Sequence, residues 1–194
     1  MNITRIFAVL KDAETLLSVR YDRERYDQDH HTELNRIYAL WTDPEYLFEF
    51  FVSQEHDLLS GFFEGVDVED AVLTTLGEAK DLFTMLLQAA QAADGGDFSA
   101  FEVLFKPLDN GADPATPILA LKAYGPDQPS WLRLFAIRLP GDVYAIVGGT
   151  IKLTPTLNTR EHTAKELAKV RGATAYFTEM LDGRNFFALY DIID

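Results

Sequence analysis

The fold is decided by four short apolar segments in the second half of the chain: FEVLFKPL (101–108), ILALKAYG (118–125), WLRLFAIRL (131–139) and VYAIVGG (143–149). Polar spacers separate them, and the last spacer, Pro140-Gly141-Asp142, is typical of a tight hairpin turn. Both faces of the third segment are largely apolar, which predicts a central strand covered on both sides. The Gly-Gly pair that ends the fourth segment predicts a β-bulge or a close backbone approach.

The remaining strands and the last helix are predicted from the two ends of the chain. ITRIFAVL (3–10) and TLLSVRY (15–21) flank a polar KDAE, which indicates an N-terminal hairpin. A final helix is expected to begin near Asn158, where Asn158 and Glu161 resemble a capping box. The tail NFFALYDIID could form an extra edge strand or a docked segment.

Between the hairpin and the sheet, apolar residues recur at helical spacing and predict three helices. Thr42 or Asp43 is expected to cap the second helix, because Pro44 then falls in its first turn, where a missing N–H costs nothing. Asp67 is expected to cap the third and clearest helix, which ends at ADGGD (93–97).

These elements predict an α+β fold in which helices flank an antiparallel sheet of about four to six strands. The 194 residues fit a single domain, 1–194. Within it, 1–30 would hold the N-terminal strands, 31–93 a helical insertion, and 101–194 the sheet and the C-terminal helix.

Composition excludes several classes of protein. The chain is 47% hydrophobic and 25% charged, which is typical of a folded globular protein. It has no cysteine, which excludes disulfides, thiolate metal sites and a cysteine nucleophile. No apolar run approaches 18 residues, and the N-terminus is too short and acidic for a signal peptide, so we expect no membrane segment and a cytoplasmic location.

Charge is distributed unevenly along the chain. The net charge is −14, which argues against nucleic acid as a partner. Residues 1–100, however, hold 7 basic and 20 acidic side chains, whereas 101–194 hold 10 and 11. Within 116–172 there are 8 basic and only 4 acidic side chains. This asymmetry indicates either a partner for the basic segment or ordinary variation of the surface.

Common catalytic motifs are absent. The chain has no GxGxxG, GxxxxGK[ST], HExxH or GxSxG sequence, so dinucleotide, NTP, zincin and α/β-hydrolase chemistry lose their usual support. Asp27, Asp29, His30 and His31 could bind a divalent ion, but a polar loop explains them better. We therefore expect no metal and no cofactor.

The stretch WLRLFAIRLPGDVYAIVGGTIKLTPTLNTREHTAKELAKV (131–170) resembles the C-terminal half of RelE/HigB-type toxins, particularly a branch related to a phage-derived protein family. In those proteins an arginine-bearing strand and a hairpin lead to a glycine-containing strand, a lysine-rich segment and a helix. LWTDPEYLFEFF (40–51), LFKPLDN (104–110) and GGTIKLT (148–154) also resemble a family of uncharacterised bacterial proteins. The resemblance implies a RelE-like fold with an enlarged helical N-terminal part.

The resemblance also implies a function: a toxin of a toxin–antitoxin type system, neutralised by an antitoxin protein, that cleaves mRNA on the ribosome. Such endoribonucleases need no metal, because a base activates the ribose 2′-OH, cations stabilise the phosphorane, and an acid protonates the leaving oxygen. The positions that match catalytic roles are Lys152 and Arg160, with His162 as acid or base. Those that match substrate binding are Arg133, Arg138 and Lys165.

Other hypotheses remain open. On the same fold, the chain could be a non-catalytic module that binds a protein through its helices. The toxin hypothesis predicts an exposed, continuous basic surface over 131–171, whereas the module hypothesis predicts that Arg133, Arg138 and Lys152 pair with carboxylates. A small-molecule enzyme would need a concave pocket with perturbed ionisable groups. No pattern in the sequence predicts an oligomeric state.

Overall fold

The structure, a computed structural model, describes residues 1–11, 13–26, 31–60, 63, 65–109, 111–113, 115–127 and 129–182. Its strands are β1 (Ile3–Leu10), β2 (Ala13–Tyr21), β3 (Phe105–Pro107), β4 (Leu119–Tyr124), β5 (Leu132–Leu139) and β6 (Val143–Ile151). Its helices are α1 (Glu33–Trp41), α2 (Pro44–Ser53), α3 (Glu55–Ser60), α4 (Val68–Asp94), α5 (Ser99–Leu104) and α6 (Glu161–Asp182). This composition confirms the predicted α+β class.

The described strands form one sheet in the order β1-β2-β6-β5-β4-β3. Neighbouring strands are antiparallel except for β2 and β6, which run parallel over Leu16–Ser18 and Tyr144–Ile146. The sheet is therefore mixed, and the predicted antiparallel pattern holds for every other pair. The parallel pair lies where the N-terminal hairpin, β1 and β2, joins a sheet whose other strands all come from beyond residue 104. No hairpin connects β2 to β6, so their directions need not alternate.

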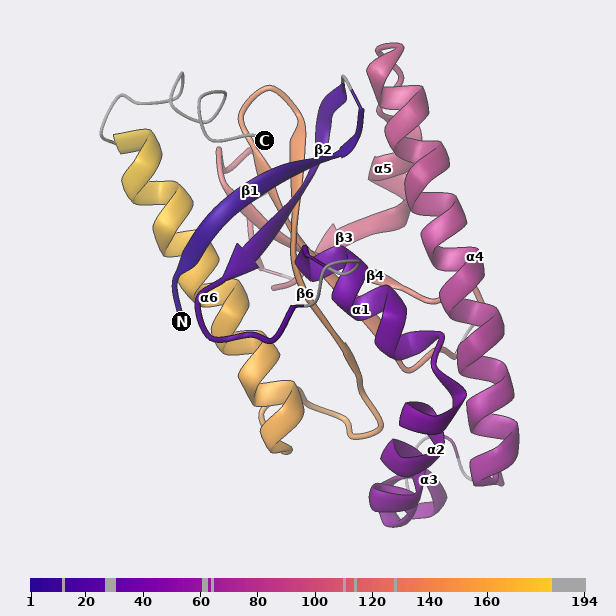
Figure 1. The fold of residues 1–194 in the computed structure, drawn as a ribbon. Helices are drawn as coiled ribbons and strands as arrows, with labels where there is room; N and C mark the ends of the chain where they lie inside the picture. Colours follow the sequence, from indigo (N-terminus) through magenta and orange to yellow (C-terminus); the bar gives the residue numbers. More distant parts are fainter. Residues whose placement is uncertain are drawn as a thin grey trace.

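The sheet lies between two layers of helices. Figure 1 shows α6 on one side of the sheet and α1, α4 and α5 on the other. β5 is central and supplies both layers, because successive side chains of a strand point to opposite faces. Its residues facing α1 and α4 are Leu132, Leu134 and Ala136, and those facing α6 are Phe135, Ile137 and Leu139. The prediction that this strand is covered on both sides is confirmed.

The expected turn lies at the start of β6, and the expected bulge lies in the middle of that strand. Gly141 and Asp142 have φ values of 79° and 57°, the left-handed backbone of the tight turn that joins β5 to β6. The register changes between Phe135 and Ala136, so that Val147 is an extra residue on the β6 side. A bulge of this kind bends its strand, and Gly148 and Gly149 follow it directly in β6.

The predicted helix caps are confirmed in the first half of the chain. Asp43 accepts hydrogen bonds from the backbone N–H groups of Glu45 and Tyr46, and Asp67 accepts one from Asp70. α4 ends at Asp94, inside the predicted ADGGD break. The second predicted helix is divided, because the chain turns after Ser53 and restarts as α3.

Two boundaries differ from those expected. The segment 101–108 was expected to be a strand, but α5 extends to Leu104 and only three residues form β3. Phe101 and Leu104, three residues apart, both reach the apolar layer under α4, which a helical turn allows and a strand does not. α6 begins at Glu161, so Asn158 lies outside it, and the tail 185–194 lies outside the described residues.

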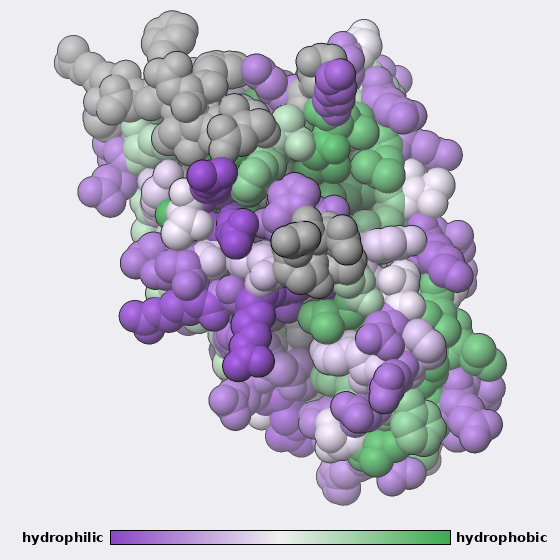
Figure 2. All heavy atoms as spheres, in the orientation of Figure 1, coloured by the Kyte–Doolittle hydropathy of each residue, from purple (hydrophilic) through white to green (hydrophobic). Residues whose placement is uncertain are grey.

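The surface differs between the two sides of the view in Figure 2. Hydrophilic side chains cover the lower left, where Figure 1 has the first half of α6 and the loop after β2. Apolar side chains gather between the β1–β2 hairpin and the upper part of α4. In the part of the chain described here, no helix is both long and apolar enough to cross a membrane.

Candidate functional site

Arg133 and Arg138 lie on opposite faces of the sheet. They are five residues apart in β5, and an odd separation in a strand reverses the side-chain direction. Arg133 shares the face of Phe135, which α6 covers, whereas Arg138 shares the face that α4 and α5 cover. There the Arg138 guanidinium forms a hydrogen bond with the hydroxyl group of Tyr144. The structure therefore does not bring the two expected substrate-binding arginines together.

Three basic side chains meet on the α6 face, at the end of the sheet where β6 leads into the loop before α6. They are Lys122 of β4, Arg133 of β5 and Lys152, the residue after β6, and we call them the cationic cluster. Arg133 pairs with Tyr124 across the β4–β5 ladder, and its guanidinium carbon lies 4.0 Å from the centroid of the Tyr124 ring. Lys122 Nζ lies 6.0 Å from the same centroid, so the ring supports both cations.

The cationic cluster has no ion pair with a carboxylate among the described residues. Arg133 donates hydrogen bonds to the carbonyl oxygens of Ser130 and Leu132, at 2.8 and 2.6 Å. Lys122 Nζ donates to the Leu108 carbonyl at 3.1 Å. Lys152 is held by its backbone N–H, which donates to Trp131 O at 2.8 Å, while its half-buried ammonium has no hydrogen bond in the described part. The Glu78 carboxylate of α4 also acts on Arg133, from beyond ion-pair distance. Three cations against this one carboxylate leave a net positive charge, which suits a phosphate group.

Proximity within the cluster changes the acidity of Lys152. Burial lowers the pKa of the Lys152 ammonium, and the positive charges of Arg133 and Lys122 lower it further. Burial also lowers the pKa of Arg133, but a guanidinium keeps its proton throughout the physiological range. The Lys152 ammonium therefore loses its proton more readily than that of an ordinary lysine, and a neutral lysine amine can act as a general base.

Arg160 is bound to an acidic helix. Its Nε donates to Asp57 Oδ2 at 2.5 Å, and its Nη2 donates to Asp57 Oδ1. Asp57 comes from α3, and its side chain is only 8% exposed. The guanidinium holds the pKa of this carboxyl below its ordinary value. Arg160 therefore joins α3 to the start of α6, and its charge is already neutralised.

His162 belongs to a set of side chains that satisfies the free edge of β6. The pairing of β2 with β6 stops at Ile146, so on that edge the backbone groups of the next residues of β6 face no strand among the described residues. The Tyr21 hydroxyl donates to Val147 O at 2.8 Å, and Glu166 Oε2 accepts the Gly149 N–H at 3.1 Å. His162 Nε2 lies 3.0 Å from the Ile151 carbonyl, which makes Nε2 the protonated nitrogen. His162 thus holds α6 to the sheet.

A buried ionic network lies behind this edge. Lys169 Nζ lies 2.5 Å from Glu33 Oε1, 2.8 Å from Glu166 Oε1 and 3.1 Å from Glu24 Oε1. Arg36 completes the network, because its Nη2 donates to Glu33 Oε1 at 2.6 Å and its Nε donates to Glu33 Oε2 at 3.1 Å. The side chains of Lys169 and Glu33 are 1% and 0% exposed. This network joins the loop after β2, α1 and α6 at one point.

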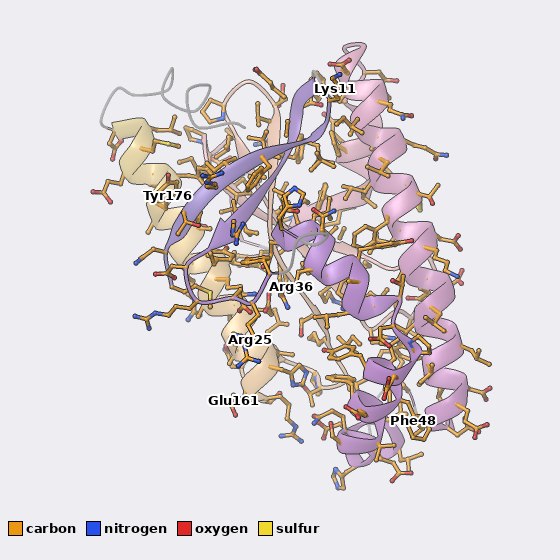
Figure 3. All side chains as sticks on the ribbon, viewed as in Figure 1. Lys11, Arg25, Arg36, Phe48, Glu161 and Tyr176 are labelled. Carbon is orange, nitrogen blue, oxygen red and sulfur yellow. The ribbon has the colours of Figure 1, made fainter. Side chains whose placement is uncertain are left out.

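The network opens into a small hollow. Arg36, Lys165 and Glu166 line it beside His162, and its volume is about 190 Å³. Figure 3 shows Arg36 between α1 and α6. Burial raises the pKa of the Glu166 carboxyl. Ionisable groups with shifted pKa values are common in enzyme pockets, which makes this hollow a second candidate site.

Each cation at this hollow already has a carboxylate partner. Lys165 lies 2.8 Å from Glu24 Oε1, and Lys169 and Arg36 share Glu33. Because no cationic charge is left over, the hollow offers little attraction for an anionic substrate. Its volume is also less than that of a nucleotide-binding pocket. The network therefore fits a structural role better than the binding of RNA.

Metal binding has little support within the described residues, where no group of three His, Asp or Glu side chains could hold an ion. Asp27, Asp29 and His30 lie outside the described residues. His31 is described, and its ring lies edge-on to Phe7 at 5.4 Å between centroids.

Lys122 of the cationic cluster, and Tyr124, whose ring contacts its cations, were not among the residues predicted from the sequence. Lys122 and Tyr124 lie in LALKAY, where strict alternation of buried and half-buried residues puts both on one face. This alternation is visible in the sequence, but their neighbour Arg133 is known only from the register of β4 against β5. The sequence therefore could not show that Lys122 and Tyr124 lie beside Arg133, because this contact depends on the pairing of β4 with β5.

Comparisons with known proteins do not assign the chain to a family. No protein-family model matches it, and no curated protein or solved structure matches it significantly. The fold and the cationic cluster define a mixed-sheet α+β protein with an anion-binding candidate site, and the function is argued from that site.

Proposed function

We propose that the chain is a toxin-like protein of a toxin–antitoxin type system and cleaves mRNA on the ribosome as a metal-independent endoribonuclease. The observation that carries this proposal is the cationic cluster: Lys122, Arg133 and Lys152 share one face without an ion-paired carboxylate in the described part of the chain. The RelE/HigB-type resemblance covers two of these residues. The proposed setting is the cytoplasm, where an antitoxin protein would neutralise the activity.

The cluster provides groups for the required chemistry. Neutral Lys152 accepts the proton of a ribose 2′-OH, and the 2′ oxygen attacks the adjacent phosphorus. Arg133 and Lys122 stabilise the negative charge that develops on the phosphorane oxygens. The bond from phosphorus to the 5′ oxygen breaks, and that oxygen takes a proton from water. The products are a 2′,3′-cyclic phosphate and a 5′-hydroxyl end.

The net charge of −14 is compatible with this proposal because of where the charge lies. Residues 1–100, which hold 20 of the 31 acidic side chains, form β1, β2 and α1 to α4. Of these helices, α1 and α4 lie on the opposite side of the sheet from α6 (Figure 1), although the Glu78 carboxylate of α4 acts on Arg133. Nucleic-acid affinity depends on the cations that contact phosphates. A local site can therefore bind RNA on a protein whose distant face is acidic, at a reduced rate of encounter.

The test is cleavage of mRNA in a bacterial translation extract, mapped by primer extension, with purified wild-type protein and four variants. We expect Lys152→Gln to lower the cleavage rate at least about 100-fold, as the loss of a general base does. Lys11→Gln is the matched control, because Lys11 is exposed at the hairpin turn beside the opposite end of β6. Figure 3 shows Lys11 at the tip of this hairpin.

The other two variants test which face of the sheet holds the site. Arg133→Gln should lower cleavage strongly, whereas Arg138→Gln removes the same charge from the same strand on the other face. Equal effects of these two substitutions, or equal activity of Lys152→Gln and Lys11→Gln, would reject the cluster as the active site. Melting curves establish that each variant is folded.

The alternative, a non-catalytic protein-interaction module, is favoured by a different surface. Val9, Tyr38, Phe83 and Leu87 line an apolar hollow of about 430 Å³ between α1, α4 and the β1–β2 hairpin. Figure 2 shows it as the green region beside α4. A wild-type protein that neither binds nor cleaves RNA, with or without ribosomes, would favour this alternative.

A further inference from the structure

A groove continues from the cationic cluster along the sheet. It lies between α6 and β4 and has a volume of about 660 Å³. Ala120 of β4 and Leu108, the residue after β3, line it on the side of the sheet. Its α6 side is lined by Leu167, Arg171 and Thr174. The groove exists because α6 covers β5 and β6 more fully than it covers the outer strand β4, whose α6-facing residues are half-buried.

The groove and the cationic cluster adjoin along β4, and Leu108 contacts both. Ala120 and Lys122 are successive residues on the same face of β4, about 7 Å apart along the strand. Lys122 Nζ donates to the carbonyl of Leu108, which lines the groove. A chain bound with one phosphate on the cluster would therefore continue into the groove.

Arg171 gives the groove a cation of its own. It is exposed on the second turn of α6 beyond Glu166, and no carboxylate lies within ion-pair distance of it among the described residues. Asp109 is the carboxylate that lines the groove, and its Oδ1 already accepts the Gly111 N–H at 3.0 Å. Apolar side chains between Arg171 and the cluster would lie against a sugar or a base.

We propose that this groove binds the nucleotide adjacent to the scissile phosphate, with Arg171 as the contact for a second phosphate of a single-stranded RNA. The inference rests on the proposed function and adds a subsite to it. A single RNA strand fits because its phosphates alternate with apolar sugar and base surfaces, as the cations and apolar walls alternate here.

The experiment measures the affinity of fluorescent RNA for the purified protein at several salt concentrations. We expect Arg171→Gln to weaken binding of a hexanucleotide roughly tenfold, as the loss of a hydrogen-bonded charge does. The slope of log affinity against log salt should fall by about 0.7, the value for one phosphate of a single strand. Binding of a dinucleotide with one phosphate should change little. Arg25→Gln, at an exposed arginine in the loop after β2, is the matched control.

A second pair of variants separates occupancy of the groove from charge. Ala175→Trp fills the groove at an exposed position that lines it, and we expect weaker hexanucleotide binding with little change in the salt slope. Ala168→Trp makes the same change at an exposed position of α6 that does not line the groove, and it should bind as the wild type does.

The outcomes distinguish the two proposals. If the wild type neither binds free RNA nor cleaves mRNA in the translation extract, the proposed function fails, and the groove proposal fails with it. If Lys152→Gln and Arg133→Gln weaken RNA binding but Arg171→Gln and Ala175→Trp do not, the cluster remains and the groove proposal is overturned. Loss of dinucleotide binding in Arg171→Gln would also overturn it, because the effect would then not depend on a second phosphate.

Discussion

Individual lysines of this protein carry charge in two different environments. Lys169 is buried and surrounded by three carboxylates, and although burial opposes its charge, Glu33 and Glu166 raise its pKa above the ordinary value. Lys152 is half-buried beside two cations, and its pKa is lowered. The first lysine is therefore held in its charged form, whereas the ammonium of the second loses its proton more readily than that of an ordinary lysine.

Lys169→Met should destabilise the protein by about 3–5 kcal/mol, because it leaves buried carboxylates without their partner. Lys165→Met is the control: Lys165 lies one turn earlier on α6, but its side chain is 53% exposed, so the loss should be below about 1 kcal/mol. Urea unfolding measures both values. Similar losses for the two variants would contradict the structural role of the network.

The pH dependence of RNA cleavage should report the pKa of Lys152. The rate should rise with pH as the ammonium loses its proton, because only the neutral amine accepts the proton of the 2′-OH. Burial and the charge of Arg133 hold this pKa below 10.5, so Arg133→Gln should move the rising limb to higher pH. A limb that stays in place in this variant, measured in single-turnover reactions, would show that another group titrates.

At the level of secondary structure, the side chains of α6 that contact β6 are spaced like the backbone groups of β6 that they bind. His162 and Glu166 are four residues apart on α6 and reach Ile151 and Gly149, which are two residues apart on β6. Four residues of helix rise about 6 Å, and two residues of strand rise about 6.6 Å. This agreement allows one helix face to satisfy the strand edge that β2 leaves open.

Close contact between these two elements explains Gly148. An added Cβ at Gly148 would lie 2.6 Å from Glu166 Oε2, which the ionic network holds in place. Gly148→Ala should therefore cost roughly 2 kcal/mol of stability. Gly77→Ala in α4, where an added Cβ meets nothing within 4 Å, should instead stabilise the protein by about 0.5–1 kcal/mol. Chemical denaturation of both variants checks the signs, and a stabilising Gly148→Ala would contradict this packing.

For the whole molecule, the central strands connect both apolar layers. β5 and β6 contribute side chains to the core under α4 and to the core under α6. Loss of either layer would expose one face of the same strands. The described elements are therefore expected to unfold together.

Phe177→Ala tests this cooperativity. Phe177 is fully buried under α6, whereas Trp41 and Trp131 both belong to the core on the opposite face. The substitution should cost about 3–5 kcal/mol. Tryptophan fluorescence and helical circular dichroism should shift to the same lower urea concentration. A fluorescence transition that does not move would show that the two layers unfold independently.

The sequence alone determined the features that depend on neighbouring residues. The caps at Asp43 and Asp67, the hairpin turn at Gly141, the bulge before Gly148 and the covered strand β5 all follow from local chemistry and periodicity. Alternation along β5 also implied that Arg133 and Arg138 point in opposite directions, although both were grouped as substrate contacts.

The pairing of charges, by contrast, depends on how the folded chain brings distant residues together. Asp57 lies 103 residues before Arg160, and Glu33 lies 136 residues before Lys169, so no local pattern reveals that these cations are paired. The parallel joining of β2 to β6 and the register that brings Lys122 to Arg133 and Lys152 are equally non-local. The physical reason is that an ion pair or a strand register depends on distance in space, whereas sequence patterns record only distance along the chain.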